Sequence, residues 1–395
     1  MKKFTLILAT VALLAAGCTK TEVVGPQNRK GINFAAYTAK TTKAVQKDVT
    51  TENLDNFKVT AFGNGALYFD NVTFKKSTES IESTESTEST EITVWKSDTK
   101  YFWPAFPLTF YAYNTPYGYG TGVQPTGFVI EMGEDTTLTV IPATKLANQE
   151  DLVAAYAKSK KESDATSTGK SLSLTFNHYL TQVIVKAKNS SSAYKVVVDG
   201  VKIANMAGQG TYTFSTNKMA APAGIMNNTN SIDYTATFAP KTLTSGAQEV
   251  MTDAGKGRWY LIPQSVRAWK QGKDVDDPDL KNNNTVNGTA NGTYLALKVL
   301  ISTKAGAQIY PKTGSETAWM AVPVPAAQEF AQGKRYTIIL DFFGNNGAGY
   351  VDPEVPGELD GDNQTDDSGK PIVGSEIKFN AEVVNWQDVE ITISL

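Results

Sequence analysis

The chain has 395 residues, a formal net charge of −3, one cysteine and one histidine. Its four arginines and mildly acidic balance argue against nucleic acid as a partner, because phosphate binding needs a basic surface. With His178 as the sole histidine, catalytic triads with a histidine base and multi-histidine metal sites lack the residues they need. We expect His178 to pack or hydrogen-bond beside Phe176.

The first 17 residues have the composition of a secretory signal peptide, with two lysines, an apolar run from Phe4 to Leu14 and small residues at the end. Cys18 follows directly, and its position resembles the lipobox of bacterial lipoproteins, although Ala15 stands where a larger aliphatic residue is usual. An incidental free cysteine is the alternative, but no second cysteine is present to form a disulfide. We therefore predict an acylated Cys18 that anchors the protein to a membrane.

Residues 18–30 are polar and predict a tether that ends in a basic site, Asn28-Arg29-Lys30, open to proteases. An ordinary tether with basic residues is the alternative. Ile32, Phe34 and Ala36 then alternate with other residues, as in a short strand.

Short alternating runs between Phe57 and Tyr113, separated by glycines and prolines, predict antiparallel strands packed as a sandwich. The Ser-Thr-Glu repeats of Ser77–Glu91 are too polar to bury anything and predict an exposed loop. Aromatic residues gather in Tyr101–Tyr119. We favour a sandwich core over a sugar-stacking surface here, because apolar alternation continues through the segment.

Asn148–Lys161 is the clearest helix candidate, and strand patterns then resume to Phe342. Asn189–Ser192 is a plausible hinge, so we expect an N-terminal β-sandwich domain at residues 31–189 and a C-terminal one at 190–395.

The acidic residues between Asp352 and Asp367 could form a calcium-binding site. A calcium loop of the EF-hand type starting at Asp360 fails, because Thr365 stands where glycine is needed and Pro371 where glutamate is needed. A solvated tether is favoured. No glycine-rich phosphate loop is present and no local motif supports hydrolysis by a carboxylate pair. We infer a non-enzyme without cofactor or metal.

The final segment, residues 376–395, contains two alternating runs. Ile377, Phe379, Ala381 and Val383 share one face of the first, and Val389, Ile391, Ile393 and Leu395 share one face of the second. A terminal strand on a long tether can pair within its own sheet or add to the sheet edge of another molecule. The pattern alone leaves both open.

Several motifs follow one another along the chain. They are Ile32-Asn33-Phe34, Thr42-Lys43-Ala44, Asn53-Leu54, Tyr101-Phe102-Trp103-Pro104, Leu108-Thr109-Phe110-Tyr111-Ala112-Tyr113, Asp151-Leu152-Val153, Leu174-Thr175-Phe176-Asn177-His178, Leu261-Ile262-Pro263-Gln264, Gly333-Lys334-Arg335-Tyr336 and Val384-Asn385-Trp386. In this order they resemble the fimbrillin (type V pilin, Mfa-like) lipoproteins of Bacteroidetes. One departure is Lys43, where the family often has arginine.

The resemblance implies two tandem transthyretin-like β-sandwich domains and export as a lipoprotein to the outer membrane and cell surface. It also implies that a trypsin-like protease removes an N-terminal strand, whose place a strand of another subunit takes. In this sequence the cut would fall after Arg29, or alternatively after Lys30 or Lys43, and the donor strand would lie within Val384–Leu395.

We therefore expect a structural subunit of a fimbria that polymerises with other pilin subunits by donor-strand exchange and mediates adhesion to a host or bacterial surface receptor. The alternative is a lipid-anchored adhesin or glycan-binding protein, a tip or anchor subunit that does not polymerise and uses the Tyr101–Tyr119 aromatics. The regular alternation of Val389–Leu395 favours a stalk subunit.

Overall fold

The computed structural model describes residues 31–38, 48–50, 52–82, 89–114, 136–146, 149–165, 171–221, 231–251, 257–266, 268–269, 285–286, 289–290, 292–314, 316–325, 328–345, 347–353, 370–373 and 377–385. Nearly all their regular structure is β-strand, beside the short helix Glu162–Asp164 (η2). No helix within these ranges is long and apolar enough to cross a membrane. The expectation of an all-β chain is confirmed.

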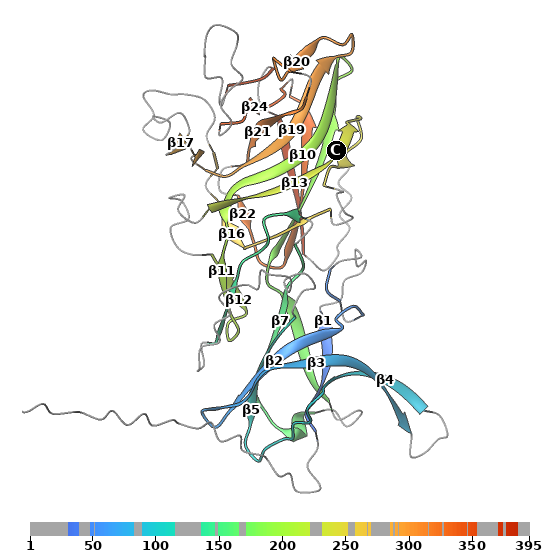
Figure 1. Ribbon diagram of the computed structural model, residues 1–395, viewed down its shortest axis with the longest axis vertical. Coiled ribbons are helices and arrows are strands. Elements are labelled where there is room, and N and C mark those ends of the chain that lie inside the picture. Colours follow the sequence, from blue (N-terminus) through green and yellow to red (C-terminus); the bar gives the residue numbers. More distant parts are fainter. Residues whose placement is uncertain are drawn as a thin grey trace, which may run out of the picture.

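The strands gather into two units, one above the other in Figure 1. The lower unit is a closed barrel with the strand order β1-β4-β3-β2-β5-β7-β8. Its strands are β1 (Asn33–Thr38), β2 (Asn56–Gly63), β3 (Ala66–Glu82), β4 (Ser89–Ser97), β5 (Leu108–Tyr113), β7 (Val153–Lys160) and β8 (Ser171–His178). Fully buried Phe34, Phe57 and Phe110 stand in its core. The alternating apolar residues that predicted the strands thus pack inside the barrel.

The upper unit consists of two sheets that enclose a second core, in which Val183, Leu297 and Leu340 are fully buried. One sheet has the order β13-β10-β19-β21-β24 with β20 beside β19, and the other β14-β9-β23-β25 with β15 beside β9. Their bounds are β9 (Thr181–Asn189), β10 (Tyr194–Ala207), β13 (Ser231–Thr242), β14 (Gln248–Glu249), β15 (Trp259–Leu261), β19 (Tyr294–Thr303), β20 (Gln308–Tyr310), β21 (Ala318–Pro323), β23 (Lys334–Phe342), β24 (Tyr350–Val351) and β25 (Lys378–Asn385).

Smaller sheets complete the molecule. One contains β6 (Thr137–Val140), β11 (Gly210–Thr213) and β12 (Lys218–Ala220), and two others pair β16 (Gln264–Ser265) with β22 (Glu329–Phe330) and β17 (Thr285–Val286) with β18 (Thr289–Ala290). The β6 strand precedes the last barrel strands in sequence, whereas β11 and β12 follow β10 of the upper unit. This sheet therefore ties the two units together.

An apolar cluster lies at the junction of the units. Tyr111 on β5 and Leu152, directly before β7, contribute from the barrel. Tyr212, Phe214 and Tyr260 contribute from the second half of the chain. Such a continuous buried contact favours a fixed arrangement of the two units over a flexible linker.

The chain passes from the barrel to the upper unit between β8 and β9, which only Tyr179 and Leu180 separate. The expected hinge at Asn189–Ser192 connects β9 to β10, both in the upper unit. There the Ser190 N–H donates to the Phe342 carbonyl at 2.9 Å, which fixes the connection. We therefore propose that the domain boundary lies at Tyr179–Leu180.

The expectation of a helix at Asn148–Lys161 is wrong, because Val153–Lys160 forms β7 between β5 and β8. Its residues have fair helix propensity, but pairing with β5 buries Val153, Ala154 and Ala155 on both faces of the strand. Tertiary pairing outweighs local propensity here, as is common for short segments.

The expectation of an exposed loop at Ser77–Glu91 is also wrong, because the residues that the structure describes there are strands. Ser77–Glu82 continues β3, Ser89–Glu91 begins β4, and the two arms pair from Ser77↔Val94 to Glu82↔Ser89. The backbone groups of the repeats satisfy one another, and the β-branched threonines suit a strand that needs no burial. The repeats therefore lengthen a hairpin.

The first run of the terminal segment is docked on its own subunit, since β25 pairs antiparallel with β23 from Lys334↔Asn385 to Asp341↔Lys378. The expectation of a buried face for this run is only partly correct. Ile377 is buried, whereas Ala381 is exposed and Val383 is 49% exposed. The strand β25 lies at the edge of its sheet, where Ala381 and Val383 face solvent.

Replacing Ser80–Glu91 by Asn-Gly, a tight two-residue hairpin turn, should change the free energy of unfolding by less than about 0.5 kcal/mol, because the removed arms extend beyond the barrel core. Urea unfolding followed by tryptophan fluorescence measures this. A loss of more than about 2 kcal/mol would mean that the hairpin stabilises the barrel.

Candidate functional site

The strand β1 closes the barrel, and it is held differently on its two sides. It runs parallel to β8 over its whole length, from Asn33↔Ser171 to Thr38↔Phe176. On the other side a single registered pair, Phe34↔Trp95, joins it to β4. Every other neighbouring pair of strands in the barrel is antiparallel. The strand β1 therefore fills a slot between β4 and β8.

Side chains of β1 and the residue before it reach into the core at every second position. Ile32 and Ala36 are 2% exposed and Phe34 is completely buried. The Phe34 ring lies 4.7 Å from that of Phe74 and 5.3 Å from that of Phe110, centroid to centroid, both edge to face. These geometries are the favourable ones for aromatic pairs. The slot thus accepts apolar side chains spaced two residues apart.

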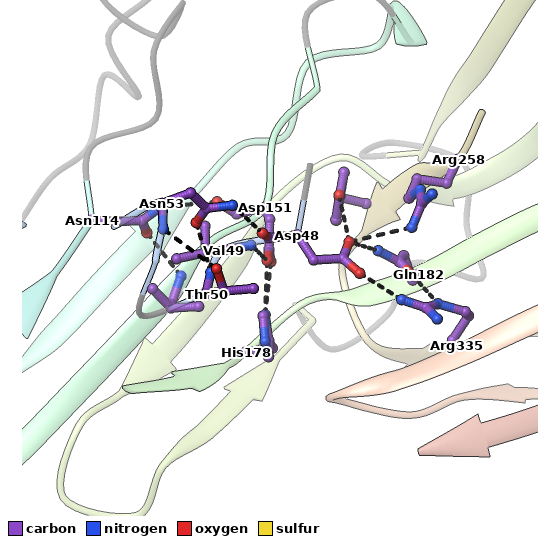
Figure 2. A network of polar contacts seen from close by, with 12 residues as sticks. Asp48, Val49, Thr50, Asn53, Asn114, Asp151, His178, Gln182, Arg258 and Arg335 are labelled. Carbon is purple, nitrogen blue, oxygen red and sulfur yellow. Dashed lines mark hydrogen bonds and ion pairs between the residues drawn. The ribbon is translucent and has the colours of Figure 1, made fainter. Parts of the chain in front are cut away.

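Asp48 is the next described residue after β1. It is buried among residues of the upper unit (Figure 2). Arg335 Nη2 lies 2.5 Å from Asp48 Oδ2, and Arg258 Nη1 lies 3.3 Å from Asp48 Oδ1. Gln182 Nε2 and the Tyr260 hydroxyl also donate to Oδ1, at 2.5 and 3.1 Å. We name these five residues the Asp48 anchor.

The charged groups of the Asp48 anchor are buried, so the stability of the fold depends on their pairing. Asp48 is 0% exposed, Arg258 6% and Arg335 8%. Charges removed from water in this way are tolerated only when they are paired and hydrogen-bonded. Burial, with the nearby Asp48 and Asp151 carboxylates, raises the pKa of Tyr260 well above its usual value, so its hydroxyl stays protonated and donates.

The residues that follow Asp48 are held by contacts of their own. The Val49 N–H donates to Asp151 Oδ2 at 2.7 Å, and Asn53 Nδ2 donates to the Asp48 carbonyl at 2.7 Å (Figure 2). Trp95 Nε1 donates to the Leu54 carbonyl at 2.8 Å. None of these bonds involves β1. The described residues between Asp48 and Leu54 are therefore held by contacts that include no direct bond to that strand.

His178 lies in the same network, with Nδ1 at 2.9 Å from Asp151 Oδ2. Complete burial raises the pKa of Asp151, and the charge and hydrogen bond of His178 oppose that rise. The sequence-based expectation that His178 makes a hydrogen bond is met, and Figure 2 shows its ring directed toward Asp151. Its role is positional.

Most residues predicted to carry function lie outside the described residues. These are Cys18, Arg29, Lys30, Lys43, Val389, Ile391, Ile393 and Leu395, and also the acidic residues after Pro353. Asp352, the first acidic residue of the predicted tether, is described and is completely buried. It accepts a hydrogen bond from the Tyr294 hydroxyl at 2.9 Å. It therefore belongs to the fold and not to a solvated tether.

The aromatic segment is core, as favoured from the sequence. Trp103, Phe110, Tyr111 and Tyr113 are all at most 3% exposed. Tyr117 and Tyr119 lie outside the described residues.

A shallow groove of about 520 Å³ lies on the outer side of the barrel, over β2, β5 and β7. Phe62, Tyr111 and Tyr156 form its aromatic part, and Thr109 and Lys158 its polar part. The Tyr111 ring lies 5.7 Å from that of Phe62 and 5.4 Å from that of Tyr156. A pocket that combines aromatic faces with a few polar groups suits a small ligand.

Sequence reasoning missed the Asp48 anchor, because its members lie far apart in the chain. A signal was present in the arginines, of which the chain has only four. Arg258 and Arg335 each stand next to an apolar strand segment, Trp259–Leu261 and Tyr336–Phe342. An arginine at such a place indicates a buried carboxylate partner.

Within the described ranges, no group of three or more histidine, cysteine, aspartate or glutamate side chains is placed to hold a metal ion. These features define a two-unit β protein in which the first described strand, β1, closes a barrel and the last, β25, pairs at the edge of a sheet.

A family model described as fimbrillin-like matches residues 42–350. The chain belongs to the fimbrillin-like family. Membership makes it a structural, non-enzymatic protein of the cell surface, with a role as a pilus subunit or in adhesion and with other pilin subunits as partners. Both β1 and β25 lie outside the matched range.

Among solved structures, a fimbrial protein from Bacteroides vulgatus is similar over 91% of this chain and 100% of its own, with 15% identity and a TM-score of 0.49. A candidate cell adhesion protein from Parabacteroides distasonis is similar over 90% and 98%, with 12% identity and a TM-score of 0.45. A fimbrial assembly protein from the same species is similar over 79% and 91%, with 10% identity and a TM-score of 0.34. No curated protein sequence matches significantly. The family assignment depends on the family model alone.

Replacing Asp48 by asparagine should lower the free energy of unfolding by about 3–5 kcal/mol, because Arg258 and Arg335 would lose the carboxylate that compensates their buried charges. Urea unfolding at pH 7 measures the loss. The matched control is Asp98→Asn, which removes the partner of Lys75 in an exposed pair and should cost less than about 1 kcal/mol. Equal effects of the two substitutions would contradict the importance of the anchor.

Proposed function

We propose that this protein is a pilus subunit that polymerises by strand exchange, and that β1 is the strand that is exchanged. The observation that carries the proposal is the asymmetric pairing of β1, which has a full parallel ladder with β8 but one registered pair with β4. Loss of β1 would open the barrel at one place and leave the antiparallel order β4-β3-β2-β5-β7-β8 intact. The opened edges would then need a new strand.

The C-terminal run Val389, Ile391, Ile393 and Leu395 is our proposed donor. It has the spacing of two residues that Ile32, Phe34 and Ala36 have in the slot. It offers four large aliphatic side chains where the described slot receives three apolar ones, the last of them an alanine. Each fully buried aliphatic side chain stabilises by about 1.5–3 kcal/mol. The exchange would therefore favour the donor.

Processing is proposed in two parts. Acylated Cys18 would hold the exported chain at the outer membrane, and a trypsin-like cut after Arg29 would free the chain from this anchor. Such a cut leaves β1 attached, because β1 begins at Asn33. A cut after Lys43 would also separate β1 from the rest of the chain. The Asp48 anchor would then keep the new N-terminal segment in place while the slot is empty.

The proposal is tested with the Cys18→Ser chain, trimmed by limited trypsin digestion and examined on unboiled denaturing gels, with mass spectrometry of the new N-termini. We expect a ladder of bands in wild type and none after deletion of Val389–Leu395, because that variant retains the slot but lacks the donor. The tail deletion should keep its monomeric fold by circular dichroism.

The triple variant Lys40→Gln, Lys43→Gln, Lys47→Gln separates the two cuts, because trypsin can then cut after Arg29 but not directly behind β1. If it still forms the ladder, the cut after Arg29 is sufficient. If it stays monomeric while wild type polymerises, separation of β1 is required. A ladder in the tail deletion would overturn the proposed donor.

A second candidate function is glycan binding by the groove over β2, β5 and β7. The partly exposed rings of Phe62 and Tyr156 beside polar Thr109 and Lys158 favour it. Sugar rings pack their C–H faces on aromatic rings and hydrogen-bond with neighbouring polar groups. This function would suit an adhesive subunit whether or not it polymerises.

Tyr156→Ala should weaken binding on a glycan array at least tenfold for any sugar that wild type retains, because it removes one aromatic wall of the groove. The matched control is Tyr194→Ala, which removes a tyrosine stacked on Phe343 in the upper unit and should leave binding unchanged. Equal binding by wild type and Tyr156→Ala would exclude the groove.

A further inference from the structure

Lys202 and Asp352 meet on the outer face of the upper unit, far from the barrel slot. Lys202 lies on β10, and Asp352 directly follows β24. Lys202 Nζ lies 3.1 Å from Asp352 Oδ2, and the two side chains are 10% and 0% exposed. Two strands, β19 and β21, separate β10 from β24 in the sheet. The pair therefore bridges across β19 and β21.

Small residues under the bridge allow this reach. Lys202 is registered with Ala296 on β19, and Ala296 with Ala321 on β21. Aromatic rings border the bridge, with Lys202 Nζ 5.2 Å from the ring centroid of Tyr294 and 5.7 Å from that of Trp319. The amine and the carboxyl group thus meet in a site of low water content.

Two further groups complete the site. Asp233 Oδ2, on β13, lies 3.7 Å from Lys202 Nζ, and its side chain is 36% exposed. The Tyr294 hydroxyl donates to Asp352 Oδ1 at 2.9 Å. The site therefore holds an amine, a carboxyl group, a second carboxylate beside the amine and a hydrogen-bond donor on the oxygen that faces away from the amine.

We propose that Lys202 and Asp352 form an intramolecular amide crosslink. In the low-dielectric site, transfer of one proton from Lys202 to Asp352 converts the ion pair into a neutral amine and a carboxylic acid. The amine nitrogen then bonds to Asp352 Cγ, and the Tyr294 hydroxyl stabilises the negative charge that develops on Oδ1. These are the roles that acyl transfer to an amine requires.

The step balances without a co-reactant. The attacking nitrogen gives one proton to Asp233, the Cγ–Oδ2 bond breaks, and the leaving hydroxyl takes that proton back from Asp233 and departs as water. The products are an amide N–H, one water molecule and Asp233 in its original state. Asp233 acts as the proton acceptor and donor through one bridging water, because its Oδ2 lies 3.7 Å from Nζ, beyond direct hydrogen-bond reach, and its side chain is partly exposed.

The exposed pair Lys75–Asp98 lacks this combination. Lys75 Nζ and Asp98 Oδ2 are closer, at 2.7 Å, but their side chains are 59% and 82% exposed. Water stabilises both charges of such an exposed pair, and a charged ammonium is no nucleophile. Proximity alone is thus insufficient, and this exposed pair serves as an internal control.

The crosslink is tested by peptide mapping of the full-length Cys18→Ser chain after denaturation and tryptic digestion. We expect a missed cleavage at Lys202 and a joined peptide with Lys202 and Asp352, one water lighter than the sum of its parts. The Lys75 and Asp98 peptides of the same digest should be unjoined. Denaturation dissolves an ion pair, so it separates a covalent bond from a contact.

Asp233→Asn should abolish the joined peptide while leaving both Lys202 and Asp352 in the chain, and Lys202→Met should abolish it as well. If Lys202→Met fails to fold, Asp233→Asn alone decides. Free Lys202 and Asp352 peptides in wild type would overturn the proposal, and a joined peptide in Asp233→Asn would overturn the role of Asp233. The measurement needs no polymer, so it is independent of strand exchange.

Discussion

The backbone groups along the edge of a β-sheet must be paired, and in the barrel this requirement falls on β1. The strands β4 and β8 cannot pair with one another while β1 lies between them, and β1 satisfies β8 along its whole length. Burial of Phe34 among the rings of Phe74 and Phe110 adds the packing. Closure of the barrel and the order of its core thus depend on one strand near the chain's N-terminal end.

The strand content of the chain could be predicted from its alternation. Leu295–Ile301 and Tyr336–Phe342 are strands with buried alternate residues, as expected, and Trp259–Leu261 is a strand buried at all three positions. Two segments failed for opposite reasons. Val153–Lys160 has residues that suit a helix but pairs with β5, and the Ser-Thr-Glu repeats have no apolar face but pair with each other. In both segments, hydrogen bonding to a neighbouring strand decided the structure. The sequence of one segment alone does not show which strand will pair with it.

The polar part of the site could not be predicted, because it depends on contacts between distant residues. Asp48 lies 287 positions from Arg335 and 210 from Arg258. Nothing in the local sequence around Asp48 distinguishes it from an exposed aspartate. His178 differs, because its position at the end of an alternating strand indicated a packed role, and it bonds to Asp151.

The near-continuity of β8 and β9 has a mechanical consequence. If subunits join as proposed, tension in the fibre acts on the wall of the slot, which β8 forms, and on the C-terminal segment beyond β25. The backbone carries this tension from β8 through Tyr179 and Leu180 into β9. From there it passes to β23 across a parallel ladder from Arg335↔Gln182 to Phe342↔Asn189. Force along such a ladder acts in shear, so its hydrogen bonds share the load instead of breaking one after another.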